Sequence, residues 1–250
     1  MASGFIESGA GYRGHLGLGP VTAGCTDRDY TRKLCVGNNV PGTIEEVVDA
    51  SGKAVAAPPF KHAYAGVGVA SDSGAMHSLL ISQDGKAYIS GSNSKGQLCL
   101  GELDTTYVDY FHEVKGVDNV VKGAVGEDFT LLVTESGDVY GCGSNEVGQI
   151  GEGTDVFESP TIIKGALNGI TDVATGLGFA VYLNGETGET WGSGSNIYGQ
   201  LCGFTEGTPV VIPEVRYPAC RIAYPLCSQE CLRWCCCIPC RLYLKEYQKK

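Results

Sequence analysis

The chain has 250 residues, of which 43% are hydrophobic, and a mean hydropathy of −0.01. This composition favours a folded core over general disorder, and no stretch approaches the roughly 18 consecutive apolar residues of a membrane-spanning helix. The formal net charge is −10, because residues 1–215 carry −15 and residues 216–250 carry +5. Since an acidic body repels phosphate backbones, we expect no direct binding of nucleic acid.

The first residues show no secretory signal. Met1–Gly19 lacks an apolar run of the required length, and Arg13 and His15 interrupt it. We therefore expect an intracellular protein, cytoplasmic or nuclear, in which most of the 12 cysteines are reduced thiols.

Residues Gly9–Gly14 match the dinucleotide-binding pattern Gly-X-Gly-X-X-Gly. That pattern needs a strand before it and a helix after it, so that the helix N-terminus meets the pyrophosphate. Only eight residues precede it in this chain, and the following Leu16–Pro20 cannot continue a helix. We expect no bound cofactor.

Glycine is the outlier of the composition, with 37 residues where average usage gives roughly 17. Six of these glycines recur at matching places in three segments that superimpose without gaps. The segments are Gly91–Leu98, Gly143–Ile150 and Gly194–Leu201, and their first glycines lie 52 and then 51 residues apart. The chain is therefore a tandem array of repeats of about 51 residues.

Each glycine-rich segment follows two short apolar runs that are joined by a turn. The turn contains Gly85 in the first repeat and Gly137 in the second, and it is looser around Gly185–Gly188 in the third. Glycine supplies the positive φ that a tight hairpin turn needs, so these runs predict β-hairpins.

The repeats also share a position for a packed ring. Phe129 and Phe179 occupy it in the second and third repeats, and His77 occupies it in the first. Because the equivalent residues are apolar, we expect His77 to pack in the core. The four histidines of the chain show no metal spacing.

A unit of about 50 residues with several short strands is typical of a β-propeller blade or a β-solenoid coil. We predict an all-β fold of about three to four such units. A degenerate partial repeat occupies residues 1–20, and an insertion or loop occupies residues 21–60. The tandem repeats follow over residues 61–215, and a basic, cysteine-rich tail occupies residues 216–250.

The pattern Gly-X-Asn-X-X-Gly-Gln-Leu, preceded by a hairpin turn and a Gly-X-X-His/Phe element, resembles the regulator of chromosome condensation repeat. The resemblance covers residues 62–215 and, more weakly, residues 9–19. That family forms seven-bladed β-propellers, so the resemblance implies β-propeller blades in an incomplete array.

Several positions depart from the family pattern. The family's tryptophan before the first core glycine is replaced by Ser90, Cys142 and Ser193. Its closing glycine is replaced by Cys99 and Cys202, whereas the second repeat keeps it. Cys227 stands where the next repeat should carry its upstream glycine.

We interpret the residues of the repeat core as structural. The glycines form turns, and the asparagines and glutamines cap main-chain groups of the loops. We expect no catalytic residue, since the sequence holds no Gly-X-Ser-X-Gly elbow and no phosphate loop. The core residues are Gly91, Asn93, Gly96, Gln97, Gly143, Asn145, Gly148, Gln149, Gly194, Asn196, Gly199 and Gln200.

Seven of the 12 cysteines lie within residues 220–240, and three interpretations of this tail stay open. The tail has no selected role, or it is lipidated, or it binds a metal. Lipidation beside basic residues would give peripheral contact with a membrane, whereas the spacing of the cysteines matches no common zinc finger. The lipidation candidates are Cys235, Cys236, Cys237 and Cys240, and the metal candidates are Cys227, Cys231 and Cys235.

These observations favour a non-enzymatic protein–protein interaction or scaffold module, since loops on a rigid scaffold are where recognition resides. The alternative is guanine nucleotide exchange on a small GTPase, the activity best known for the family that the repeats resemble. That activity works through protein contact.

Overall fold

The protein is described by a computed structural model, which covers residues 6–7, 42–66, 76–101, 106–151, 156–163, 167, 169–201 and 212–215. Its elements are all β-strands, and no helix occurs among these residues. The predicted all-β fold is confirmed. The degenerate repeat and the cysteine-rich tail lie almost wholly outside the described residues.

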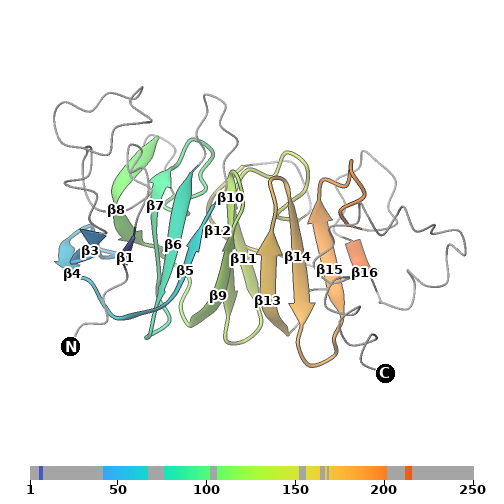
Figure 1. The fold of residues 1–250 in the computed structure, drawn as a ribbon, viewed down its shortest axis with the longest axis horizontal. Coiled ribbons are helices and arrows are strands. Elements are labelled where there is room, and N and C mark those ends of the chain that lie inside the picture. The colour runs from blue at the N-terminus through green and yellow to red at the C-terminus, as the bar shows by residue number, and fades with distance from the viewer. Residues whose placement is uncertain are drawn as a thin grey trace, which may run out of the picture.

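Three antiparallel four-stranded units follow one another along the chain and stand side by side in Figure 1. The first blade consists of β5 (Phe60–Ala65), β6 (His77–Ser82), β7 (Ala87–Ser92) and β8 (Tyr107–Glu113). The second blade consists of β9 (Val120–Val125), β10 (Phe129–Thr134), β11 (Val139–Gly143) and β12 (Phe157–Ile162). The third blade consists of β13 (Ile170–Thr175), β14 (Phe179–Asn184), β15 (Thr190–Gly194) and β16 (Ile212–Val215).

The two central strands of each blade form the hairpins that the sequence predicts. Gly85 and Gly137 lie in the turns of the first two hairpins, with φ of 82° and 83°. A residue with a Cβ atom is strained in this left-handed region, which explains why glycine recurs there.

Each blade packs its sheet face against the next blade. Alternate residues of a strand point to opposite faces, so one strand contributes to two interfaces. Leu79 of the first blade shares a buried cluster with Leu132 of the second. Leu131, the neighbour of Leu132 in β10, shares a different cluster with Tyr182 of the third blade. The array is therefore built from one repeated sheet-on-sheet contact.

Residues 42–57, which lie within the insertion or loop predicted over residues 21–60, contain short strands. They contain β2 (Gly42–Thr43), which pairs with β1 (Ile6–Glu7), and a hairpin of β3 (Glu46–Val48) and β4 (Ala54–Ala56). Strand β3 pairs in parallel with β8 and extends the first sheet to six strands. The apolar residues of this segment drive it onto the sheet, where it buries surface that water would otherwise contact.

The β3–β4 hairpin covers the face of the first blade that points away from the second. Val47 and Ile44 are buried in a cluster with Leu80 and Phe111. Leu80 occupies the position that Leu132 and Tyr182 hold in the later blades, where a preceding blade covers it. Among the described residues, the hairpin thus lies where a preceding blade would pack.

Candidate functional site

The glycine-rich loops after β7, β11 and β15 share one hydrogen-bonded geometry. In the first loop the side-chain oxygen of Asn93 accepts a hydrogen bond of 3.0 Å from the Leu98 amide, and that of Gln97 accepts one of 2.8 Å from the Lys95 amide. The second and third loops repeat both contacts at 2.7 to 3.0 Å. The asparagine and glutamine side chains therefore fix the loop backbone.

The core glycines provide close approaches between neighbouring segments. Gly143 has a φ of 105°, and a Cβ atom placed on it would lie 2.2 Å from the carbonyl oxygen of Asp128. Gly194 has a φ of 94° and would meet the carbonyl oxygen of Gly178 at 2.3 Å. Side chains are excluded at both positions by the backbone itself.

The first and second loops also connect their blades to the next one through a main-chain carbonyl. The Gln97 carbonyl accepts a hydrogen bond of 2.8 Å from the Thr130 hydroxyl of the second blade. The Gln149 carbonyl accepts hydrogen bonds from Ser193 at 2.8 Å and from the Tyr182 hydroxyl at 3.4 Å, both in the third blade. These buried contacts add a directional bond to the apolar packing between blades.

Ser90 holds in the first blade the position that Ser193 holds in the third. Its side chain is fully buried, but its hydroxyl has no hydrogen-bond partner. In the later blades the loop of the preceding blade supplies an acceptor at this place. The first blade thus carries a donor group without the acceptor that the repeat elsewhere provides.

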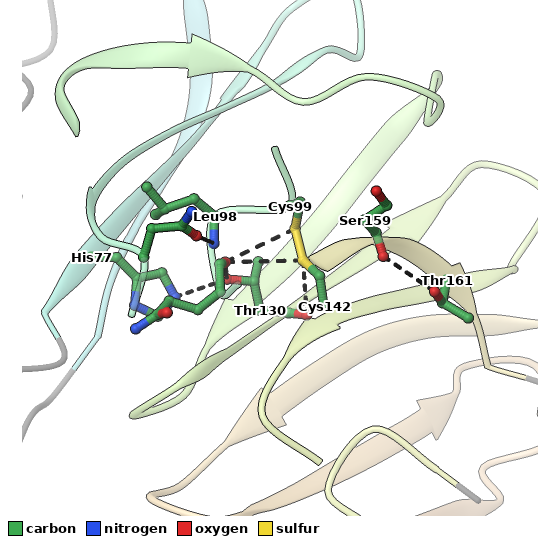
Figure 2. The surroundings of a disulfide bond; sticks show 9 residues. His77, Leu98, Cys99, Thr130, Cys142, Ser159 and Thr161 are labelled. Carbon is green, nitrogen blue, oxygen red and sulfur yellow. Dashed lines mark hydrogen bonds between the residues drawn. A yellow bond between two sulfur atoms is a disulfide. The ribbon is translucent and has the colours of Figure 1, made fainter. Parts of the chain in front are cut away.

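A disulfide joins Cys99 in the first loop to Cys142 on β11, with a Cα–Cα distance of 5.4 Å (Figure 2). Both side chains are buried. Cys99 stands where the second repeat has Gly151 and keeps the left-handed conformation of that position, with a φ of 59°. Cys142 stands where the other repeats have serine. Sequence reasoning noticed the two departures separately and missed that blade packing brings them together.

His77 is buried at the contact between the first two blades. Its Nε2 atom lies 2.8 Å from the Thr130 hydroxyl, as Figure 2 shows. Burial lowers the pKa of His77 from 6.5 to about 3, so the ring is neutral. His77 therefore packs in the core as expected, and Thr130 links it to the Gln97 carbonyl.

The outer ends of the same loops are exposed and form the candidate binding site. Ile197 and Tyr198 at the tip of the third loop are 53% and 86% exposed, and Leu177 in the neighbouring β13–β14 turn is 50% exposed. Val147, at the tip of the second loop, packs beside Gly178 of that turn. We call these four apolar residues the loop surface.

Charged residues lie at the same ends of the first two blades. Lys95 forms an ion pair with Glu146, with a distance of 2.7 Å between Nζ and Oε1. The pKa of Asp128 is raised by burial and by the negative charges of Glu127 and Glu146. The loop surface is thus bordered by a group of charged residues that is mainly acidic.

Neither a metal site nor a membrane span is found in the described part of the chain. Within the residues that the structure places, no three histidine, cysteine or acidic side chains are arranged to hold a metal ion. The same residues include no helix long and apolar enough to cross a membrane. The tail cysteines proposed for lipidation or metal binding lie outside the described residues.

The blades and their loops define a β-propeller-type repeat protein, and solved structures share this fold. One is described as Kap60 bound to yeast RCC1 (Prp20), and it matches with a TM-score of 0.53 and 21% identity over 64% of this chain and 37% of that chain. The structure of human WBSCR16 matches with a TM-score of 0.50 and 23% identity over 65% of this chain and 41% of that chain.

Two overlapping ranges, residues 120–149 and 136–183, match the Regulator of chromosome condensation (RCC1) repeat. Residues 120–183 therefore carry repeats of this type, as the sequence pattern predicted. Protein RCC2 of Homo sapiens is 39% identical over 137 residues, which cover 53% of this chain and 26% of that protein. The RCC1-like G exchanging factor-like protein of Homo sapiens is 32% identical over 148 residues, which cover 56% of this chain and 32% of that protein.

The matched region thus spans about a quarter to a third of the length of these relatives. The likeness establishes the kind of repeat. The activities of the longer relatives enter only as proposals for this chain.

Proposed function

We propose that this chain is a non-enzymatic protein-interaction scaffold that binds a protein partner through the loop surface. The observation that carries the proposal is the contrast within the third loop. The side chains of Asn196 and Gln200 hold its backbone, whereas Ile197 and Tyr198 between them are exposed. Apolar side chains presented on a rigid backbone lose little entropy when a partner binds them.

The chemistry of the surface suggests the kind of segment that fits it. Tyrosine and aliphatic side chains at the centre of an interface supply much of the binding free energy. The acidic border around Glu127, Asp128 and Glu146 favours a partner that carries basic residues beside its apolar ones. The same charge disfavours nucleic acid.

Affinity capture with matched variants tests the proposal. The full chain, an Ile197→Ser/Tyr198→Ser variant and an Ile162→Ser control would be compared for the proteins that each retains from an extract. Ile162 is 39% exposed and lies on β12, away from the third loop. We expect a partner bound by the full chain and the control to be lost from the loop variant, with unchanged thermal unfolding. Equal retention by all three would contradict the proposal.

A second candidate function is guanine nucleotide exchange on a small GTPase. The observation in its favour is sequence similarity to a protein named as an exchange factor. The Secretion-regulating guanine nucleotide exchange factor of Bos taurus is 34% identical over 48% of this chain and 27% of that protein. Release of a fluorescent guanine nucleotide from candidate GTPases measures this activity directly. A chain that binds a GTPase without accelerating release would support the scaffold and remove exchange.

A further inference from the structure

The disulfide between Cys99 and Cys142 lies at a blade contact that the next repeat makes without a covalent bond. Cys142 holds the position of Ser193, whose hydroxyl donates a 2.8 Å hydrogen bond to the Gln149 carbonyl. Cys99 holds the position of Gly151. Because glycine and serine cannot form a disulfide, the contact between the second and third blades depends on packing and hydrogen bonds alone. The cross-link is therefore an addition to a contact that the repeat can form without it.

Hydrogen-bond acceptors stand beside both sulfur atoms, as Figure 2 shows. The Sγ atoms of Cys99 and Cys142 each lie 3.9 Å from the carbonyl oxygen of Gln97. The Sγ atom of Cys142 also lies 4.0 Å from the carbonyl oxygen of Thr130. A thiol is a weak hydrogen-bond donor, whereas a disulfide sulfur has no hydrogen to donate. The site therefore offers acceptors that only the reduced form of the two cysteines uses.

Other buried contacts join the first two blades whether or not the cysteines are cross-linked. The Thr130 hydroxyl donates a 2.8 Å hydrogen bond to the Gln97 carbonyl, and Leu79 and Leu132 share one apolar cluster. Neither contact involves a sulfur atom. The packed blades are thus compatible with both oxidation states, which a reversible switch requires.

The two cysteines differ in how readily solvent can reach them. Both side chains are buried, but Cys99 lies two residues before the exposed Gly101 and has a φ of 59°, a conformation that strains a residue with a Cβ atom. Cys142 lies in β11, which pairs with β10 on one side and β12 on the other. Local opening of the loop end therefore exposes Cys99 before Cys142.

We propose that Cys99 and Cys142 form a reversible redox switch that reacts with a low-molecular-weight disulfide of the glutathione type. On oxidation the Cys99 thiolate attacks glutathione disulfide, forms a mixed disulfide and releases one glutathione thiolate. The Cys142 thiolate then attacks the Cys99 sulfur and displaces the second glutathione. The two cysteines lose two electrons and two protons, and glutathione disulfide becomes two glutathione thiols. Excess reduced glutathione reverses both steps.

The switch sets how firmly the end of the first loop is held against the second blade. The Gly101 amide donates a 2.9 Å hydrogen bond to the Glu158 carbonyl on β12, and the Cys99 amide donates one of 3.0 Å to the Gly96 carbonyl. Reduction leaves these bonds free to break by local opening of the loop end, whereas the disulfide anchors Cys99 to β11 and keeps them closed. The proposal does not depend on the loop surface.

Equilibration of the folded full chain in buffers of varied glutathione to glutathione disulfide ratio tests the proposal. Alkylation of free thiols, followed by mass spectrometry of peptides, would follow Cys99 and Cys142 separately from the other cysteines. Hydrogen–deuterium exchange of the same samples would report on residues 97–101. Residues 149–151 are the internal control, because the Gly151 amide donates the equivalent hydrogen bond in the second loop, to the Gly148 carbonyl. Cys142→Ser is the control variant, since it cannot form the cross-link.

We expect the thiols of Cys99 and Cys142 to be lost together as the buffer becomes oxidising, and to be restored by reduced glutathione without unfolding. Oxidation should slow exchange over residues 97–101 at least about tenfold, with no such change over residues 149–151 or in Cys142→Ser.

Four results would overturn the proposal. They are the absence of this disulfide at every ratio, a mixed disulfide at Cys99 that Cys142 does not resolve, a disulfide that reduced glutathione does not open in the folded chain, and equal exchange in both forms. Far-UV circular dichroism would show that Cys142→Ser keeps its β-structure. None of these results involves the binding of a partner, so failure here leaves the proposed scaffold function intact.

Discussion

The hydroxyl of Ser193 donates a 2.8 Å hydrogen bond to the main-chain carbonyl of Gln149, and this bond ties the third blade to the loop of the second. The equivalent hydroxyl of Ser90 is equally buried and has no acceptor. Two serines at the same place in the repeat therefore differ in what they contribute. One satisfies a buried carbonyl, and the other is a desolvated polar group without a partner.

Substitution of the two serines should have opposite consequences. We expect Ser193→Ala to lower the free energy of unfolding by about 1 to 2 kcal/mol, because it removes the shorter of the two hydrogen bonds to the Gln149 carbonyl. Ser90→Ala should leave stability unchanged or raise it slightly, since it removes an unsatisfied hydroxyl. Urea unfolding of both variants measures the difference. A larger loss of unfolding free energy in Ser90→Ala than in Ser193→Ala would contradict this account of the blade contact.

Alanine substitution at Gly143 and at Gly52 distinguishes the cost of a steric clash from the cost of backbone strain. Both have a positive φ, 105° and 85°, so Gly→Ala adds conformational strain at each. Only at Gly143 would the new Cβ atom meet a backbone atom, 2.2 Å away; around Gly52 nothing lies within 4 Å. We expect Gly52→Ala to cost about 1 to 2 kcal/mol and Gly143→Ala at least about 2 kcal/mol more. Similar unfolding midpoints for the two variants would show that the loop shifts easily.

The disulfide and the left-handed conformation of Cys99 affect stability in opposite directions. Which of the wild type and the Cys99→Gly variant is more stable should therefore depend on the redox conditions. In reducing buffer we expect Cys99→Gly to be as stable as the wild type or up to about 1 kcal/mol more stable, because glycine tolerates this φ. In non-reducing buffer the wild type should be the more stable by about 2 to 4 kcal/mol, owing to its cross-link. Thermal unfolding in both buffers tests this order.

Cys142→Ser is the control for that comparison. It removes the cross-link and introduces the serine that the first and third repeats have at this position. Its stability should be the same in both buffers. If reduction leaves the wild type unaffected as well, the two cysteines do not cross-link the blades.

The buried His77 predicts a loss of stability in acid. Its pKa is about 3 in the folded protein and near 6.5 in the unfolded chain, so between these values the unfolded state binds the extra proton. The contribution of the neutral His77 ring to the free energy of unfolding is complete above pH 6.5. It is lost as the pH falls towards 3, and the free energy of unfolding then changes by up to about 1.4 kcal/mol per pH unit. His77→Phe, which introduces the residue of the other two repeats, should flatten this dependence.

Urea unfolding at about pH 7.5 and about pH 5 provides the measurement. The wild type should lose more stability than the variant between the two conditions. An equal loss would assign the acid sensitivity to other groups, since the pKa of His112 is also lowered by burial.

Much of the repeat could be predicted from the sequence because its signals are local. Glycines at positive φ mark the hairpin turns and loops, and the asparagines and glutamines bond to main-chain groups only two to five residues away. The alignment of His77 with Phe129 and Phe179 was enough to place its ring in the core.

The remaining features depend on contacts between distant segments. Cys99 and Cys142 are 43 residues apart, and only blade packing brings their sulfur atoms together. The β3–β4 hairpin lies outside the repeat period, although its turn has a local sequence signal. Asp49 caps the turn through its side chain, and Gly52 supplies a positive φ between two valine-containing runs.

The hairpin that covers the first blade also gives the chain a direction in which to fold. Its residues are synthesised before the first blade, so Leu80 and Tyr88 find their apolar cover as soon as that blade leaves the ribosome. Each later blade then leaves the ribosome beside a blade that is already folded, and it packs against that single neighbour. Folding from the N-terminus towards the C-terminus is therefore favoured, because the first blade can bury this apolar face before the second blade has been synthesised.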